Sequence, residues 1–225
     1  MSNVPVIVIS SPKPKAGKTT LALNLAAALW SDGYHINIAS PDDETIEKFI
    51  DSRLTFCMQK KISLPTPRLI TKTSEAALNE KEVIIVDLSS ANESDANDIY
   101  NQAHTLITIT NKSQDMNLQP DDPYLNTVWN AKKNLAARGI KYLNWIVVAN
   151  LQNDQDWTDE LADLSRRYGF RIAPAIRYRQ AYQHINEGFC AADMTVNSKA
   201  FRMSFEDVYA RREILKLTDF LWQQK

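Results

Sequence analysis

Phosphate chemistry is the clearest possibility in this sequence, and it lies in the run Gly17-Lys18-Thr19-Thr20. An apolar, β-branched strand is predicted just before it at residues 4–9, and a leucine- and alanine-rich helix just after it. A helix N-terminus attracts phosphate, because its N–H groups are unpaired and its dipole is positive there. In a phosphate-binding loop, Lys18 would reach the β- and γ-phosphates and the Thr19 hydroxyl would help to hold Mg²⁺. The pattern therefore predicts a P-loop, against the alternative of an ordinary strand-to-helix turn.

The loop before this run lacks glycines that the full phosphate-binding pattern contains. Pro12 stands five residues before Gly17, where the pattern has glycine, and Pro14 and Lys15 occupy positions that are often glycine. Each proline removes one backbone N–H from the loop and fixes its own φ. Lys15 cannot adopt positive φ without strain, because it carries a side chain. The placement between strand and helix still favours the P-loop.

A second chemical group ends the apolar strand predicted at residues 82–87, where Asp87 is the last residue. A carboxylate at this place is the Walker B arrangement, in which it holds the shell of Mg²⁺. The alternative is an acidic residue at a strand end, which is common. Pairing with a P-loop on the first strand favours the metal role for Asp87.

The Gly17–Thr20 run and Asp87 must be positioned by strands and helices. The sequence predicts strands and helices in alternation. Further strands are expected at 34–39, 67–70, 106–110, 145–150 and 170–176. Helices are expected at about 44–60, 74–79, 121–138, 158–168, 179–185 and 205–222. Such alternation predicts a mostly parallel sheet with helices on both faces. We therefore expect one α/β P-loop domain over residues 1–225.

Composition limits the other possibilities. The 225 residues are 44 % apolar and carry a net charge of −1, so disorder is not expected and any nucleic-acid site must be a local patch. Cys57 and Cys190 lie far apart in no metal-like spacing, which indicates reduced thiols. Neither a membrane span nor a signal peptide is recognisable. We expect a soluble, cytoplasmic protein with no membrane partner.

The segment Lys13–Thr20 resembles the deviant Walker A motif of the ParA/MinD ATPases, K-G-G-x-G-K-[ST]-[ST], with two glycines lost. The resemblance extends nearly end to end and is greatest to the MipZ branch, which positions the division plane. It rests on the following further segments: 49–53, 60–65, Asn144–Asn150, Tyr168–Pro174, Arg177-x-Arg179-x-x-Tyr182 and Ala210–Glu213.

The resemblance implies ATP and Mg²⁺ as cofactors. By position, the nucleotide site would comprise Lys13, Gly17, Lys18, Thr19, Thr20, Asp87 and Asn150. Lys13 matches the lysine that crosses to the partner subunit's phosphates, and Asn150 the asparagine that recognises adenine; the alternative for Asn150 is a turn-forming residue. The resemblance also implies an ATP-bound homodimer that binds non-specific DNA, with a ParB-like protein and the division tubulin FtsZ as partners.

Two departures from the family concern hydrolysis. Ser40 aligns with the switch I aspartate that orients the attacking water, and a hydroxyl is a poor substitute for that carboxylate. Asp42 or Asp43 could stand in after a small loop shift, and Asp42 is the candidate catalytic residue beside Lys13 and Lys18. Switch II reads Asp87–Ser90 and lacks its glycine. We expect slow or lost hydrolysis.

An arginine-rich run at residues 166–183 contains no acidic residue and predicts an electropositive patch for DNA phosphates. Its arginines are Arg166, Arg167, Arg171, Arg177 and Arg179. The alternative is a solvated face with a few helix-pairing arginines. The patch is favoured because these side chains have no acidic partner nearby in sequence.

Three functions compete. The first is a MipZ-like, ATP-dependent dimeric switch that binds DNA in division or chromosome segregation. The second is a degenerate, non-hydrolysing relative that serves as a DNA- or partner-binding scaffold. The third, a metabolic P-loop enzyme such as a dethiobiotin synthetase-like ligase, is the weakest, because no residues for a second substrate stand out. ATP binding separates the first from the second, and turnover separates either from the third.

Overall fold

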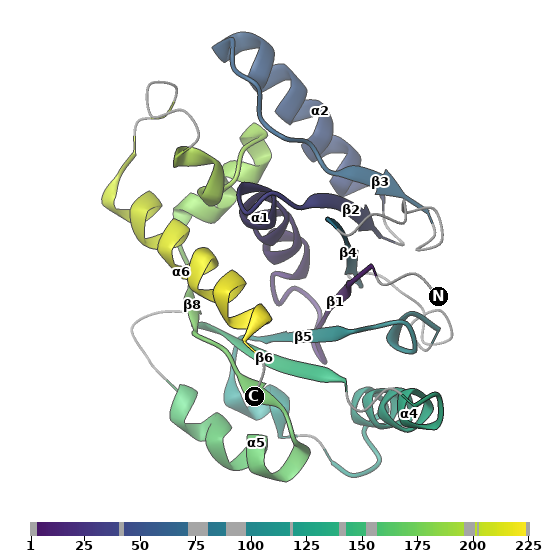
Figure 1. Ribbon diagram of the computed structural model, residues 1–225. Helices are drawn as coiled ribbons and strands as arrows, with labels where there is room; N and C mark the ends of the chain where they lie inside the picture. Colours follow the sequence, from purple (N-terminus) through teal and green to yellow (C-terminus); the bar gives the residue numbers. More distant parts are fainter. Residues whose placement is uncertain are drawn as a thin grey trace.

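A sheet with the strand order β3-β2-β4-β1-β5-β6-β7 lies at the centre of this protein, and β8 pairs with β6 (Figure 1). The computed structural model describes residues 4–40, 43–71, 81–88, 98–117, 119–139, 143–151, 157–195, 201 and 203–223. All strand pairings among these residues are parallel. The strands are β1 (Val6–Ser10), β2 (His35–Ala39), β3 (Arg68–Ile70), β4 (Glu82–Asp87), β5 (Thr105–Thr110), β6 (Asn144–Leu151), β7 (Arg171–Ile172) and β8 (Ile176–Arg177).

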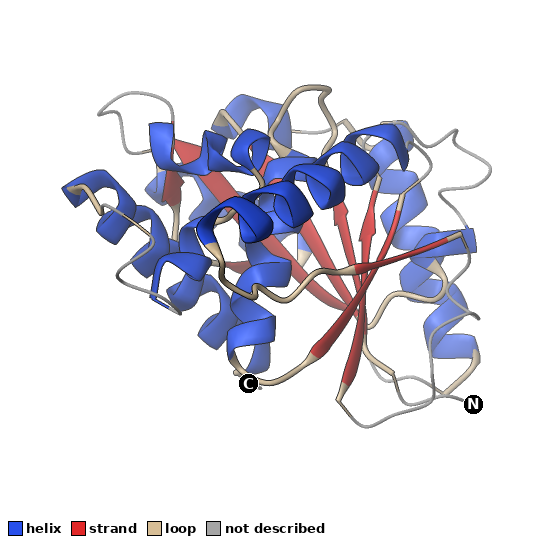
Figure 2. Cartoon of the chain, turned by 90° about the horizontal axis from the view of Figure 1, so that it is seen from above, coloured by secondary structure: helices blue, strands red, loops and turns tan. Residues whose placement is uncertain are grey.

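Helices cover both faces of the sheet, which Figure 2 shows from above. The α-helices are α1 (Lys18–Ser31), α2 (Asp43–Lys60), α4 (Pro123–Ala137), α5 (Leu161–Tyr168) and α6 (Phe205–Trp222). Short 3₁₀ segments are η2 (Ser113–Met116), η3 (Thr158–Glu160), η4 (Gln180–Glu187) and η5 (Ala191–Thr195). Among the described residues, no helix is both long and apolar enough to cross a membrane.

Strand β1 shows why the sheet needs two helical layers. Its side chains alternate between faces, and all five residues are buried. Ile7 and Ile9 belong to the core formed with α1, α2 and α6. Val6 and Val8 belong to the core formed with α4 and α5. The apolar run therefore buries both of its faces, as parallel sheets require, and the predicted α/β architecture is confirmed.

Most predicted elements agree with the structure to within two residues at each end. The single strand expected at 170–176 is wrong, because the chain forms β7 and β8 with Ala173, Pro174 and Ala175 between them. Pro174 has no N–H to donate to a neighbouring strand. After this break, β8 pairs with β6 at Asn150 and Leu151. The helix expected at 74–79 lies outside the described residues.

A buried ion pair joins α2 to η5. Arg53 is 1 % exposed and donates from two guanidinium nitrogens to the two Asp193 oxygens, each at 2.7 Å. The same guanidinium donates to the Pro65 carbonyl at 2.6 Å and to the Gly188 carbonyl at 3.2 Å. Gly188 has φ +85, and a Cβ there would lie 2.3 Å from the backbone of Ser52. Only glycine allows this close approach of η4 to α2.

Candidate functional site

The loop between β1 and α1 contains two residues in the left-handed conformation. Gly17 is the N-cap of α1 with φ 97, and Lys15 has φ 57. Lys15 therefore adopts the left-handed conformation in which a residue with a side chain is strained. For a residue with a side chain this conformation costs about 1–2 kcal/mol. The packing of the loop offsets that cost, since the next residue, Ala16, is buried against the main core.

Parallel pairing of β1 with β4 brings the loop and Asp87 together, because Ile9 lies opposite Asp87 at the carboxyl edge of the sheet. The Thr19 hydroxyl donates to Asp87 Oδ2 at 2.6 Å. Lys18 is only 7 % exposed, and burial lowers the pKa of its ammonium group while the Asp87 carboxylate opposes that shift. The lysine, hydroxyl and carboxylate that were predicted to act on phosphate and Mg²⁺ thus lie side by side.

A hydroxyl and a carboxylate are hard oxygen ligands of the kind Mg²⁺ prefers. Among the residues described here, no group of three or more His, Cys, Asp or Glu side chains could hold a metal ion. Mg²⁺ usually binds through one or two protein ligands together with substrate phosphates and water. Thr19 and Asp87 fit that arrangement, in which a nucleotide supplies the remaining oxygens.

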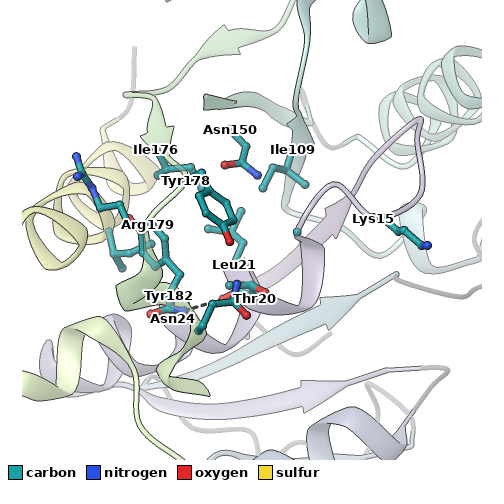
Figure 3. A pocket seen from close by; sticks show the side chains of 13 residues that line it. Lys15, Thr20, Leu21, Asn24, Ile109, Asn150, Ile176, Tyr178, Arg179 and Tyr182 are labelled. Atoms are coloured by element: carbon teal, nitrogen blue, oxygen red, sulfur yellow. Dashed lines mark hydrogen bonds between the residues drawn. The ribbon is translucent and has the colours of Figure 1, made fainter. Parts of the chain in front are cut away.

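Asn150 lies at the end of β6 beside the loop. Its Nδ2 donates to the Ala16 carbonyl at 3.1 Å and to Asn111 Oδ1 at 3.0 Å. These two bonds use both N–H groups of the amide, so the orientation of the side chain is set. Figure 3 shows its carbonyl oxygen on the side of Ile176.

A cavity of about 250 Å³ opens next to Gly17 and Asn150 (Figure 3). Its lining combines apolar and polar side chains and includes Thr20, Leu21, Asn24, Ile109, Ile176 and Tyr178. The predicted site residue Thr20 also accepts a hydrogen bond from Asn24 Nδ2 at its carbonyl oxygen, at 2.9 Å. Sequence analysis did not assign the other lining residues to the nucleotide site. The available signals were the positions of Ile109 and Ile176 in predicted strands, and of the lining residues Arg179 and Tyr182 in a family motif.

The remaining residues that concern the predicted nucleotide site are Lys13, Ser40 and Asp42. Lys13 is exposed on the loop, and its backbone N–H donates to Ser11 Oγ at 3.2 Å. Ser40 follows β2 directly and is half-buried. Asp42 lies outside the described residues.

Three arginines of the predicted DNA patch are held by bonds within the protein. Arg179 donates to Glu213 at 2.7 Å and to Glu206 at 2.9 Å, both on α6. Arg171 donates to Asn144 at 3.1 Å and to the Phe220 carbonyl at 3.3 Å. Arg166 pairs with Asp163 at 2.8 Å. The premise that these side chains have no acidic partner nearby in sequence is wrong for Arg166, because Asp163 lies three positions before it. The partners of Arg179 lie 27 and 34 positions away.

The other two arginines of the run occupy different settings. Arg167 is exposed in the last turn of α5, with its guanidinium over the Tyr168 ring at 5.1 Å. Arg177 in β8 is half-buried, and its backbone N–H donates to Glu213 at 3.2 Å. The five arginines therefore do not form one uniformly exposed patch.

A parallel sheet in this order, with a lysine-bearing loop between its central strand and the first helix, defines the P-loop class of ATPase folds. The chain belongs to the MipZ family, because the family model "ATPase MipZ" matches residues 5–222. No curated protein sequence matches the chain.

Three solved structures share the fold at low sequence identity. MinD in the MinC:MinD cell division complex of Aquifex aeolicus is 16 % identical, with 99 % of this chain and 97 % of that chain covered and a TM-score of 0.59. A Cyanothece McdA variant bound to ATP is 14 % identical, with all of both chains covered and a TM-score of 0.57. A Borrelia burgdorferi plasmid partition protein bound to AMPPNP is 13 % identical, with 97 % and 99 % covered and a TM-score of 0.55.

Proposed function

We propose that this protein is an ATP- and Mg²⁺-binding switch of the MipZ type. The observation that supports it most directly is the contact of Thr19 Oγ1 with Asp87 Oδ2 beside the buried Lys18. A buried ammonium group is expensive to desolvate unless an anion faces it. Asp87 compensates Lys18 in part, and a triphosphate would supply further negative charge at the N-terminus of α1.

Each residue would have a distinct part in holding the nucleotide. Lys18 would donate to the β- and γ-phosphates, and the N–H groups at the start of α1 would bind phosphate oxygens. Thr19 and Asp87 would hold Mg²⁺, which neutralises charge on the phosphates when bound. Lys13, which is exposed on the loop, would reach the phosphates of a second subunit in a homodimer.

The amide of Asn150 favours adenine over guanine. Both of its N–H groups are occupied by Ala16 and Asn111, so its carbonyl oxygen is the group that can contact a base. That oxygen accepts a hydrogen bond from the exocyclic amino group of adenine. Guanine places a carbonyl oxygen at the corresponding position, and two acceptors repel each other.

The test is a calorimetric titration of ATP, and separately of GTP, into the purified protein with Mg²⁺. We expect ATP to bind and GTP to bind about 5-fold to about 150-fold more weakly, since an unpaired polar group at a specific site costs about 1–3 kcal/mol. Failure of ATP to bind would contradict the proposal. It would favour the alternative of a degenerate scaffold, which the prolines and Lys15 of the loop also suggest.

Hydrolysis is proposed to be slow, because Ser40 replaces the carboxylate that orients water in the family. Ser40→Asp is then expected to raise ATP turnover, by about 10²-fold if the new carboxylate acts as a general base. Phosphate release measured at saturating ATP gives the comparison, with Ser40→Asn as the uncharged control of similar size. Equal turnover in the wild type and Ser40→Asp would assign water activation to another residue.

The cellular role is proposed from the family and the fold. MipZ-type ATPases act in division, and a MinD of this fold is solved with its partner MinC. Partner proteins would accordingly bind the ATP-bound dimer of this chain. The candidate partners in the cytoplasm are a ParB-like protein and FtsZ. A pull-down of each candidate with ATP and without nucleotide tests whether the bound state controls the contact.

Non-specific DNA binding is proposed to use the exposed end of α5. Arg166 and Arg167 remain largely accessible, and the Arg166–Asp163 pair, at 78 % and 88 % exposure, is weak enough to yield to a phosphate. Replacing both arginines by alanine is expected to weaken DNA binding and to reduce the slope of log K against log salt by about 2 for each subunit.

Anisotropy titrations on unrelated duplexes at two salt concentrations measure this effect. The control variant combines Lys60→Ala with Lys133→Ala, two exposed lysines on α2 and α4, and removes the same charge. An equal loss in both variants would show that net charge, and not the end of α5, determines DNA affinity.

A further inference from the structure

Tyr178 is an exposed aromatic side chain at the mouth of the cavity described above. It is 63 % exposed, and among the large exposed apolar side chains of the described residues it alone lines this cavity. Single exposed apolar side chains are common on protein surfaces, so the informative observation is the position of Tyr178 at the cavity and not its exposure alone. Family motifs do not account for Tyr178, which lies between Arg177 and Arg179 in the arginine-rich run.

The backbone holds Tyr178 in place on both sides. The Tyr178 N–H donates to the Leu151 carbonyl at 2.8 Å, which continues the pairing of β8 with β6. The next residue, Arg179, is fixed to Glu213 and Glu206 on α6. Only the side-chain torsions of Tyr178 can therefore change easily, and a tyrosine has few of them.

Alternation along the extended chain places Tyr178 on the same side as Ile176, and both line the cavity. Ile109 supplies another apolar surface there, and Asn150 supplies the polar edge. Figure 3 shows the Tyr178 ring extending toward the cavity, with its hydroxyl on the side of Thr20 and Leu21. An aromatic face, an aliphatic surface and one amide edge are the parts of a site for a flat heterocyclic base.

We infer that Tyr178 is a positioning residue that stacks on the nucleotide base and closes the open side of the cavity. This inference rests on the proposed nucleotide site and adds the group that retains the base. Asn150 distinguishes bases by hydrogen bonding, whereas the Tyr178 ring binds any of them, because every base has a π-face. The Tyr178 hydroxyl has no hydrogen-bond partner among the described residues, so the ring and not the hydroxyl carries the effect.

Tyr178→Ala is expected to weaken ATP binding by about 5-fold to about 150-fold, the range that corresponds to loss of one base–aromatic stack. The same variant should bind inorganic tripolyphosphate as tightly as the wild type, because that ligand has no base. Tyr178→Phe should retain the wild-type affinity for ATP. Phe205→Ala is the matched control, since Phe205 is 85 % exposed and lies outside the cavity lining.

Calorimetric titrations of ATP and of tripolyphosphate, both with Mg²⁺, provide the comparison. Equal ATP affinity in the wild type and Tyr178→Ala would overturn the stacking role and leave the proposed function standing. An equal loss for ATP and tripolyphosphate, or a loss in Tyr178→Phe as large as in Tyr178→Ala, would also overturn it. Absence of ATP binding in the wild type would overturn the proposed function, and this inference with it.

Discussion

Arg53→Ala is expected to lower the free energy of unfolding by about 3–5 kcal/mol, because it leaves the Asp193 carboxylate buried without its counter-ion. Asp193 is 2 % exposed, and it receives two guanidinium bonds of 2.7 Å from Arg53. It also accepts the Cys190 N–H at 2.7 Å. Loss of the guanidinium further removes the donors to the Pro65 and Gly188 carbonyls, so the effect extends to three segments of the chain.

Urea denaturation measures this loss, with Arg166→Ala as the matched control. The Arg166–Asp163 pair has a similar distance, 2.8 Å, but both side chains are mostly in water. Its removal should cost less than about 1 kcal/mol. Replacing both buried partners, as in Arg53→Met with Asp193→Leu, should recover much of the loss, because no isolated charge then remains. A loss no larger than that of Arg166→Ala would contradict the assigned role of the pair.

Lys18→Ala is expected to weaken ATP binding by well over tenfold, which corresponds to more than about 1.4 kcal/mol. The variant removes the buried positive charge at the place where the β- and γ-phosphates are proposed to bind. The free energy of unfolding should fall by less than in Arg53→Ala, because burial already disfavours the charged form of Lys18, and Asp87 keeps its hydrogen bond from the Thr19 hydroxyl. Binding and stability are therefore expected to separate.

The measurement is a titration of ATP with Mg²⁺ into the wild type, Lys18→Ala and the control Lys133→Ala, an exposed lysine on α4. Urea denaturation of the same three proteins tests the second half of the prediction. Equal ATP affinity in the wild type and Lys18→Ala would remove Lys18 from the nucleotide site. A large fall in the stability of Lys18→Ala would show that Lys18 serves mainly to compensate Asp87.

Local sequence patterns were sufficient to predict the elements that carry the P-loop. The apolar run before the loop can be buried only by helices on both faces, and the leucine- and alanine-rich run after Gly17 forms α1. Asp87 was predictable as a strand end, because it is the charged residue that ends an apolar run. The structure then places it within 2.6 Å of the Thr19 hydroxyl, because adjacent parallel strands end at one edge of the sheet.

Tertiary structure decided which charges pair across long stretches of sequence. The run at 166–183 has no acidic residue in its sequence, yet α6 brings Glu213 to Arg179 from 34 positions away. Arg53 and Asp193, 140 positions apart, gave no sequence signal at all. The backbone of Lys15 also differs from its residue preference, since the course of the loop requires a left-handed residue there.

The sequence by itself thus determined most of the described strands and helices to within two residues, because hydrophobic period and helix-start signals act over a few residues. It did not determine which residues line the cavity or which arginine side chains remain exposed and able to contact a ligand. Those depend on segments that meet only after the sheet has formed. The energy of a charge depends on its burial and on its nearest partner, and both are properties of the packed chain.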